Sequence, residues 1–396
     1  MTELPRVASE TFWVGVNDHE TDLFEALWPL PYGVSYNAYL VVGEKIALID
    51  AVKGHFLPEH VRKIHEVLPP GRSVDYLIIN HMEPDHTGAL QVLRSVFPGM
   101  TIIGNNKTLG MLEAFYGSSS SCRQVQDGDL LDLGTHKLQF HLTPMVHWPE
   151  TMMTYDAATG VLFSGDAFGG FGAVDEGLFD DEVNLEKMHK EMLRYFTNIV
   201  ARYGQMVLKA IDKLRQVPFT VVAPTHGTVW RRDPSMPVRL YERWSAQECD
   251  PAVLVAYGSM YGNTYRLAEA VTRGLTEHGF RPLVHDVART HASEVIADIW
   301  PRKGLILACP TYNTGLFPPM EALLAFLENK LLKHRLVGFV TSYAWAGGAR
   351  KALEGFAHRL SLEVVEPVVD VKGAGTPQDL AQCRLLASNL AERLSQ

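Results

Sequence analysis

The residues that could do chemistry gather first in one hexapeptide, His81-Met82-Glu83-Pro84-Asp85-His86, which offers four side chains of metal-ligand type. It follows an apolar run over 74–80 that is rich in branched residues and typical of a buried strand. The next residues, 87–93, have helical spacing, so we expect the hexapeptide to be a loop held between two packed elements. Imidazole and carboxylate groups at this density favour a hard or borderline metal ion.

Three further residues of ligand type follow predicted strands. His147 comes after 143–146, Asp166 after 162–165, and His226 after 219–225. Taken singly, a histidine at a strand end is more often structural, and an aspartate there is often part of a turn. Taken together, seven nitrogen and oxygen ligands at successive strand ends suit two metal ions that share a carboxylate.

The first half of the chain must supply the elements that position these ligands. It opens with a predicted β-hairpin over 34–42 and 45–50, followed by a helix over 55–67. Further short strands are predicted at 101–104, 137–142, 152–156 and 161–164. The segment 184–216 is long enough for two helices with a break near Tyr203-Gly204.

Composition bounds the class of protein. With 396 residues, 46% of them hydrophobic and 20% charged, the chain is typical of a globular protein with two domains, which we place at 1–250 and 251–396. A formal net charge of -9 argues against a nucleic-acid surface. None of the four cysteines forms a Cys-x-x-Cys pair, which disfavours a zinc ribbon, an iron–sulfur cluster or a disulfide framework. The N-terminus has no signal-peptide pattern, so we expect a cytoplasmic protein.

The second half alternates strand and helix from about residue 252 to the end. Strands are predicted at 252–257, 281–287, 304–309, 336–341 and 363–369, with helical segments between them. Five strands that alternate with helices predict a doubly wound parallel sheet of flavodoxin type.

Three loops at strand ends of this sheet form a predicted flavin mononucleotide (FMN) site. The first precedes a helix and offers small residues, hydroxyls and an amide, which can hold a phosphate through backbone N–H groups. It has neither the Lys-Ser/Thr ending of a triphosphate loop nor a Gly-x-Gly-x-x-Gly fingerprint, so a single terminal phosphate fits it better. Aromatic residues of the other loops could stack on an isoalloxazine ring. The predicted residues are Ser259, Met260, Tyr261, Gly262, Asn263, Thr264, Pro310, Thr311, Tyr312, Asn313, Thr314, Gly315, Ser342, Tyr343, Ala344, Trp345, Ala346 and Gly347.

Over almost its entire length the chain resembles a flavodiiron protein, also called an A-type flavoprotein. The family pattern His-x-Glu-x-Asp-His, followed by His, Asp and His, is matched by all seven ligand-type residues. The resemblance implies a metallo-β-lactamase-like αββα sandwich for the first half. It also implies that His81, Glu83 and His147 bind one iron, that Asp85, His86 and His226 bind the other, and that Asp166 bridges them. Where related hydrolases typically carry a second histidine, Glu83 favours iron over zinc.

The resemblance also implies a reaction. Family members reduce dioxygen to water or nitric oxide to nitrous oxide, with FMN passing electrons to a non-haem diiron site. Because no rubredoxin-like module is visible, a separate rubredoxin or a reduced deazaflavin would be the electron donor. A head-to-tail homodimer, or a dimer of such dimers, would bring the FMN of one subunit beside the irons of the other.

Two residues are candidates for the surroundings of the metal ions. Tyr195 matches a family position near the substrate pocket and could donate a hydrogen bond, although a core tyrosine is an equally ordinary interpretation. Glu25 falls where some members carry a pocket histidine, which leaves the balance between dioxygen and nitric oxide open. Trp148, beside His147, is expected to shape the pocket.

Two alternative functions remain open at this point. The first is a zinc-dependent hydrolase of the metallo-β-lactamase fold with an appended flavodoxin unit, although Glu83 argues against it. The second is an electron carrier or sensor whose metal site is structural, against which the complete ligand set argues.

Overall fold

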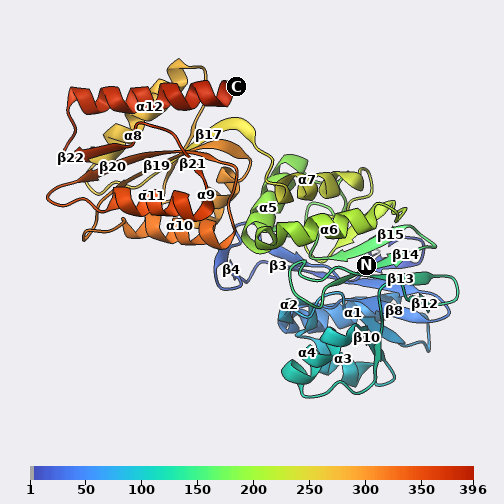
Figure 1. Cartoon of the computed structure of the whole chain (residues 1–396). Helices are drawn as coiled ribbons and strands as arrows, with labels where there is room; N and C mark the ends of the chain where they lie inside the picture. The colour runs from blue at the N-terminus through green and yellow to red at the C-terminus, as the bar shows by residue number, and fades with distance from the viewer. Residues whose placement is uncertain (1–3) are drawn as a thin grey trace. The chain divides into compact units, whose positions relative to one another are not determined.

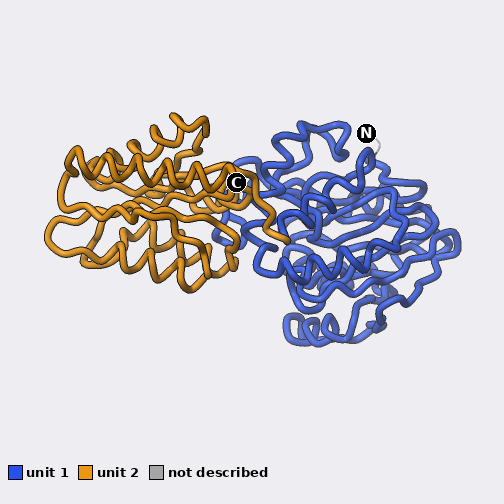
Figure 2. The backbone as a smooth tube through the Cα atoms, turned by 45° about the horizontal axis from the view of Figure 1, so that its top comes forward, with its two compact units in different colours: residues 1–245 blue, residues 246–396 orange. Residues whose placement is uncertain are grey.

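The computed structural model describes residues 4–396. The chain divides between residues 245 and 246 into two compact units (Figure 2). The division falls between Ser245 and Ala246, at the end of a helix, whereas the sequence-based boundary lies five residues later. Among the described residues, every helix falls short of the length and apolar character needed to cross a lipid bilayer.

The first unit is a sandwich of two sheets with helices on both outer faces (Figure 1). Its larger sheet has the order β1-β2-β7-β8-β9-β10-β11, and its smaller sheet the order β12-β13-β14-β15-β16. The larger sheet consists of β1 (Arg6–Ala8), β2 (Thr11–Trp13), β7 (Tyr39–Val42), β8 (Ile46–Ile49), β9 (Tyr76–Ile78), β10 (Thr101–Gly104) and β11 (Cys122–Gln124). The smaller consists of β12 (Leu130–Asp132), β13 (Lys137–Leu142), β14 (Met152–Asp156), β15 (Val161–Gly165) and β16 (Val221–Pro224).

The helices of the first unit divide between the two faces of the sandwich. Figure 1 shows α1, α3 and α4 beside the larger sheet and α5, α6 and α7 beside the smaller one. Two small hairpin-like pairs complete the unit, β3 (Val16–Asp18) with β6 (Val34–Tyr36) and β4 (Leu23–Phe24) with β5 (Trp28–Pro29). The helices are α1 (Leu57–Val67), α2 (Pro84–Thr87), α3 (Leu90–Val96), α4 (Asn106–Tyr116), α5 (Leu185–Tyr195), α6 (Gly204–Leu214) and α7 (Ser235–Ser245).

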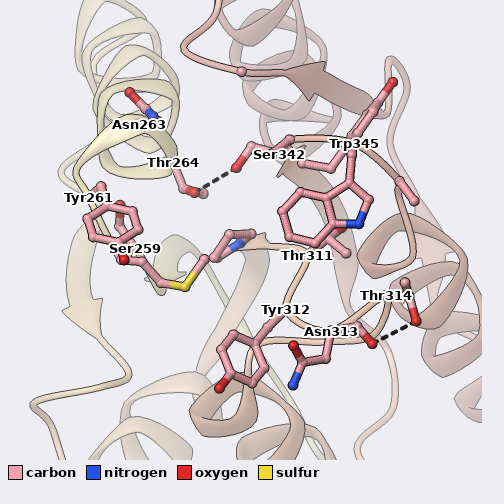
Figure 3. Close-up of a pocket in the computed structure, with 16 residues that line it drawn as sticks. Ser259, Tyr261, Asn263, Thr264, Thr311, Tyr312, Asn313, Thr314, Ser342 and Trp345 are labelled. Atoms are coloured by element: carbon pink, nitrogen blue, oxygen red, sulfur yellow. Dashed lines mark hydrogen bonds between the residues drawn. The ribbon is translucent and has the colours of Figure 1, made fainter.

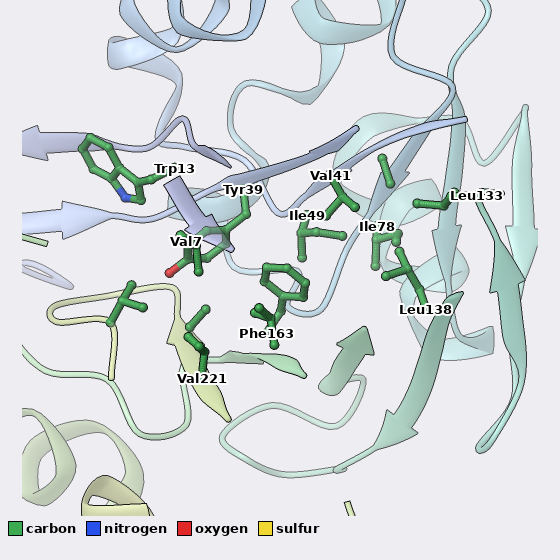
Figure 4. Packing of buried hydrophobic residues seen from close by; sticks show 14 of the residues in the cluster. Val7, Trp13, Tyr39, Val41, Ile49, Ile78, Leu133, Leu138, Phe163 and Val221 are labelled. Carbon is green, nitrogen blue, oxygen red and sulfur yellow. The ribbon is translucent and has the colours of Figure 1, made fainter. Parts of the chain in front are cut away.

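The core of the first unit lies between the two sheets. Ile49 and Ile78 from the larger sheet pack in one buried cluster with Leu138, Phe163 and Val221 from the smaller (Figure 4). Burial of such aliphatic and aromatic side chains stabilises a fold by roughly 1.5–3 kcal/mol each. This packing holds the strand ends, and hence the candidate ligands, in fixed positions.

The second unit is a parallel sheet with the order β18-β17-β19-β20, followed by two strand segments that both pair with β20. In Figure 1, α8 and α12 cover one face of this sheet and α9, α10 and α11 the other. Its elements are β17 (Asp250–Tyr257), α8 (Asn263–Glu277), β18 (Leu283–Asp286), α9 (Ala292–Ile299), β19 (Arg302–Pro310), α10 (Pro318–Asn329), β20 (Leu336–Tyr343), α11 (Ala349–Leu360), β21 (Glu363–Val364), β22 (Val369–Lys372) and α12 (Pro377–Ser395).

Most elements agree with the sequence, and the differences have local causes. The strands predicted at 101–104, 137–142 and 152–156 are confirmed residue for residue. The fifth strand of the second unit is interrupted around Pro367, which has no backbone N–H for the ladder, and it continues to Lys372. The break predicted near Tyr203 is a π-helical segment over Phe196–Val200 followed by a 3₁₀ turn over Ala201–Tyr203.

The predicted ligand loop is only partly a loop. Pro84 begins the short helix α2, so Asp85 and His86 lie in a helical turn instead of an extended strand-to-helix connection. Proline favours the first helical position because its φ is already helical and its missing N–H has no partner there. Helix α7 was not predicted, because its polar sequence reads as a linker.

Candidate metal centre and flavin pocket

The seven predicted ligands come from five places along the first unit and meet at one end of the sandwich. His81 and Glu83 follow β9, and the α2 turn carries Asp85 and His86. The remaining three follow strands of the smaller sheet: His147 lies between β13 and β14, Asp166 directly after β15, and His226 two residues after β16.

The ligand-type atoms of these residues fall into two groups, each compact enough to hold one ion. One group is His81, Glu83, His147 and Asp166, and the other is Asp85, His86 and His226. Within each group the candidate ligand atoms lie within 4.8 Å of one another. The grouping coincides with the division that the family resemblance implies.

Asp166 joins the two groups because its two carboxylate oxygens face opposite sides. Oδ2 lies 3.1 Å from His147 Nε2 and 3.6 Å from His81 Nε2. Oδ1 lies 3.1 Å from His86 Nε2 and 3.6 Å from His226 Nε2. One carboxylate therefore presents one oxygen to each group, which is the arrangement of a bridging ligand.

Several buried polar atoms at this centre lack a hydrogen bond, which fits bound metal ions. Both Asp85 oxygens, both ring nitrogens of His86 and Nε2 of His226 are buried and make no hydrogen bond within residues 4–396. Buried polar atoms without partners are costly, and coordination to a cation satisfies them. Three carboxylates and four imidazoles form a donor set that suits non-haem iron.

The charges at the centre reinforce one another. Burial raises the pKa of Asp166, but the charges of His81 and His86 outweigh it and hold that pKa well below its usual range. Burial lowers the pKa of His147, but hydrogen bonds to Asp166 and Glu83 raise it to about 9. In the metal-free protein His81, His86 and His147 therefore hold protons that a metal ion must displace, so metal affinity rises as pH rises toward 9.

Several residues that sequence reasoning missed hold these ligands in place. Glu150 accepts a 2.8 Å hydrogen bond from Nδ1 of His81, and the Ser35 carbonyl accepts one of 2.8 Å from Nδ1 of His226. The Thr225 hydroxyl donates to Asp166 Oδ1 at 2.6 Å. Such outer contacts fix the orientation of a ligand and the nitrogen that is left for the metal. The position of Thr225 directly before a ligand was a usable signal, but nothing in the sequence marks Glu150.

The two candidates for the surroundings of the metals lie in different environments. Tyr195 is fully buried, and its ring centroid lies 5.5 Å from that of His226. Burial, followed by the charge of Asp166, raises its pKa well above the usual value, so the hydroxyl stays protonated. Glu25 lies exposed on the turn between β4 and β5 and accepts a 3.2 Å hydrogen bond from Trp28 Nε1. Its neighbour Phe24 is the residue that packs against the His226 ring, at 5.4 Å.

The predicted FMN residues of the second unit surround a cavity of about 350 Å³ (Figure 3). All of the predicted residues line the cavity except Gly262, Gly315 and Gly347. One residue that was not predicted, Gly373 after β22, also lines it. Gly262 instead supplies the left-handed turn into α8, with φ of 88°. Gly373 was missed because the predicted fifth strand ends at Val369, three residues before its actual end.

The cavity combines hydroxyl groups at its base with exposed aromatic rings at its rim. Ser259 Oγ accepts hydrogen bonds from the backbone N–H groups of Gly262 and Tyr265, and the hydroxyls of Thr264 and Ser342 lie 2.9 Å apart. Tyr261 and Trp345 are 90% and 80% exposed. Hydroxyls at the N-terminus of a 15-residue helix suit a phosphate, and exposed flat rings suit stacking on a planar heterocycle.

Comparisons with known proteins agree with both halves of this description. The family described as "ODP family beta lactamase" matches residues 34–227, and the flavodoxin family matches residues 255–386. A nitric oxide reductase of Moorella thermoacetica is 29% identical over 400 residues, which covers 100% of both chains. An anaerobic nitric oxide reductase flavorubredoxin of Escherichia coli is 32% identical over 370 residues, or 90% of this chain and 77% of that protein. The rubredoxin oxygen:oxidoreductase of Desulfovibrio gigas superposes with a TM-score of 0.95 at 28% identity, covering 99% of each chain.

The fold and its relatives define a flavoprotein built from a metallo-β-lactamase-like domain and a flavodoxin-like domain. More narrowly, the chain belongs to the flavodiiron proteins. The resemblance read from the sequence and the predicted fold class are thereby confirmed, and the zinc-hydrolase alternative is not favoured.

Proposed function

We propose that this protein passes electrons from an external donor through FMN to a non-haem diiron site and there reduces dioxygen to water, nitric oxide to nitrous oxide, or both. The observation that carries this proposal is the shared carboxylate of Asp166, with one oxygen facing each of two ligand groups. Two-metal hydrolases can also share a carboxylate between their ions. What favours a reductase here is the added carboxylate of Glu83, which suits iron better than zinc, together with the flavin cavity of the second unit.

The ligand assignment follows the two groups. His81, Glu83 and His147 would hold one iron, Asp85, His86 and His226 the other, and Asp166 both. Two irons bound at this centre would supply electrons to a diatomic molecule. Tyr195 keeps its proton and would donate a hydrogen bond there, and the surrounding aromatic rings, Phe24 and Phe171 among them, keep bulk water out.

We propose which part of FMN each part of the cavity holds. We place the phosphate at Ser259, Asn263 and Thr264, where the N-terminus of α8 offers backbone N–H groups. The ring would lie beside Tyr312 and Trp345, which are 42% and 80% exposed and therefore accessible for stacking.

The two reactions determine how many electrons the donor must supply. Dioxygen takes up four electrons and four protons to give two waters, and two nitric oxide molecules take up two electrons and two protons to give nitrous oxide and one water. FMN can relay only two electrons at a time, so a donor must reload it. We propose a separate rubredoxin, or a reduced deazaflavin, as that donor, in keeping with the relative named rubredoxin oxygen:oxidoreductase.

We further propose a head-to-tail homodimer in which the flavin of one copy lies beside the irons of the other. Two exposed apolar groups support it, because large exposed apolar patches mark protein interfaces. Met260, Tyr261 and Trp345 are exposed around the flavin cavity. Leu27 and Tyr32, each 49% exposed, lie in the segment of the first unit that carries Phe24. The cytoplasmic location stays a prediction.

The test is turnover under anaerobic conditions. Protein loaded with iron and FMN is supplied with reduced rubredoxin and one gas at a time, and consumption of nitric oxide or dioxygen is measured. We expect turnover of at least one gas, and the two rates side by side decide the preference. Consumption of neither gas by the fully loaded protein would contradict the proposal, as would bound zinc together with hydrolysis of a thioester or lactam.

A further inference from the structure

The two halves of the metal centre are supported by different chemical groups. The outer nitrogen of His81 donates to a carboxylate, that of Glu150, whereas the outer nitrogen of His226 donates to a neutral backbone carbonyl, that of Ser35. Both contacts are 2.8 Å long, so the difference between them is one of charge and not of distance.

Glu150 is firmly placed beside His81. It is 1% exposed, and its Oε1 also accepts a 2.8 Å hydrogen bond from the backbone N–H of Met82. The backbone carbonyl of Glu150 accepts a hydrogen bond from the side-chain amide of Asn105, which fixes the loop that carries it. Among the ion pairs of the described residues, Glu150 pairs with His81 and with neither lysine nor arginine. Its negative charge is therefore directed at one ligand of one metal position.

We propose that Glu150 is a positioning residue that makes the two metal positions unequal. By accepting the Nδ1 proton of His81 it keeps Nε2 for the metal and makes the imidazole a stronger donor. This inference rests on the proposed ligand set. Apart from the shared Asp166, the carboxylates within 4.0 Å of a ligand imidazole are Glu83 and Glu150 at the first position and Asp85 at the second. The buried Asp50 interacts electrostatically with His86 and His81 and so does not distinguish the two positions. The first position thus binds its ion more tightly and releases it last.

Glu150→Gln removes the charge while it keeps the size of the side chain and an oxygen that can accept from His81 and Met82. We expect a full-length chain loaded anaerobically with Fe²⁺ to hold two ions in both proteins. On titration with a ferrous chelator, one ion of the variant should be released at a chelator concentration about 10- to 100-fold lower than in the wild type. The chelator concentration that releases the other ion should be the same in both proteins. Glu150→Asp keeps the charge and should therefore retain most of the difference in affinity between the two iron positions.

Variants that lack a ligand at one of the two metal positions show which ion Glu150→Gln affects. In His226→Ala the retained ion occupies the first position, and adding Glu150→Gln should show the full effect. In His147→Ala the retained ion occupies the second position, and the same addition should show none. If either background retains no iron, the two-ion titration of Glu150→Gln alone decides the question.

The chain offers a matched control in Asp156. This carboxylate is fully buried and also accepts a 2.8 Å hydrogen bond from a histidine Nδ1, that of His136, but neither residue belongs to the ligand groups. Asp156→Asn should lower the Tm of the metal-free protein much as Glu150→Gln does, yet leave both iron affinities unchanged.

The outcomes separate this inference from the proposed function. Equal weakening of both ions by Glu150→Gln, or no weakening of either, would overturn the role of Glu150 while the ligand assignment stands. If the wild-type chain holds no iron, or if Asp166→Ala keeps both ions, the ligand assignment and with it the proposed function fail.

Discussion

The two cofactor sites of this protein are built in opposite ways. The metal centre consists of buried and partly buried side chains from distant parts of the chain, and Glu83, His147 and Asp166 among them already pair with one another. The flavin pocket consists of short loops at the ends of neighbouring strands, with hydroxyls at its base and exposed rings at its rim. The first site depends on the whole sandwich for its geometry, whereas the second depends on a few local turns. A substitution at the metal centre should therefore affect the whole site, whereas one at the flavin pocket should affect only the loop that carries it.

The largest expected effect is that of Asp166→Ala. Because this carboxylate faces both ligand groups, its removal should cost both ions and lower the rate of gas reduction about 1000-fold, since removal of a metal centre removes its whole contribution to catalysis. Iron content by mass spectrometry and gas consumption measure this, and FMN affinity should stay within twofold. Loss of FMN along with iron would show that the two sites are not independent.

The scaffold of the first unit should lose stability in acid through His60. This histidine is fully buried, donates through Nδ1 to the Val14 carbonyl at 2.7 Å, and burial lowers its pKa to about 4. The unfolded chain takes up a proton on His60 near pH 6.5, whereas the folded chain does so only near pH 4. The contribution of His60 to the free energy of unfolding is therefore fully present above pH 6.5 and falls by about 3 kcal/mol as pH is lowered to 4. Chemical denaturation of metal-free wild type and His60→Gln over this pH range gives the difference. Equal pH slopes in the two proteins would disprove the assignment.

Gly348→Ala should disturb only the flavin pocket. An added Cβ would overlap the carbonyl of Thr314, which lies in a loop that lines the cavity. Because that atom belongs to backbone, the two loops must separate, and we expect FMN affinity to fall about 30-fold, a cost of about 2 kcal/mol in the range for overpacking. Gly355→Ala, within helix α11, for which Gly348 is the N-cap residue, meets only the flexible end of Arg359 and serves as the control. Fluorescence titration with FMN compares them, and an equal affinity in both variants would contradict the close approach.

Trp345→Ala should have the smallest effect. Its exposed ring can contribute to FMN binding only by stacking, which is worth about 0.5–1.5 kcal/mol beyond area burial, so we expect a loss of affinity of about tenfold or less. Iron content should not change. An unchanged FMN dissociation constant would place the isoalloxazine ring away from this loop.

The same contrast explains how much the sequence could predict. The flavin pocket is local, so three loops at strand ends were enough to find nearly all of its lining. Gly373 was missed because the last predicted strand stops at Val369 instead of Lys372. The ligands of the metal centre were recognisable by residue type and position. Their partners Glu150 and Ser35 were not, because their roles depend on contacts across 69 and 191 residues of sequence, and one of those contacts is made by a backbone carbonyl. The turn that places Asp85 and His86 was missed because four residues carry too little periodicity to predict a helix.

A single-turnover experiment tests the central claim most directly. Protein that holds both iron and FMN is fully reduced under anaerobic conditions and mixed with nitric oxide, while flavin absorbance and nitrous oxide are recorded together, with metal-free, FMN-loaded protein as the reference. The proposed function predicts that the flavin is reoxidised as nitrous oxide forms, and that the metal-free reference forms none. A flavin that stays reduced, with no nitrous oxide formed, and a parallel dioxygen experiment no faster than the metal-free reference, would contradict it.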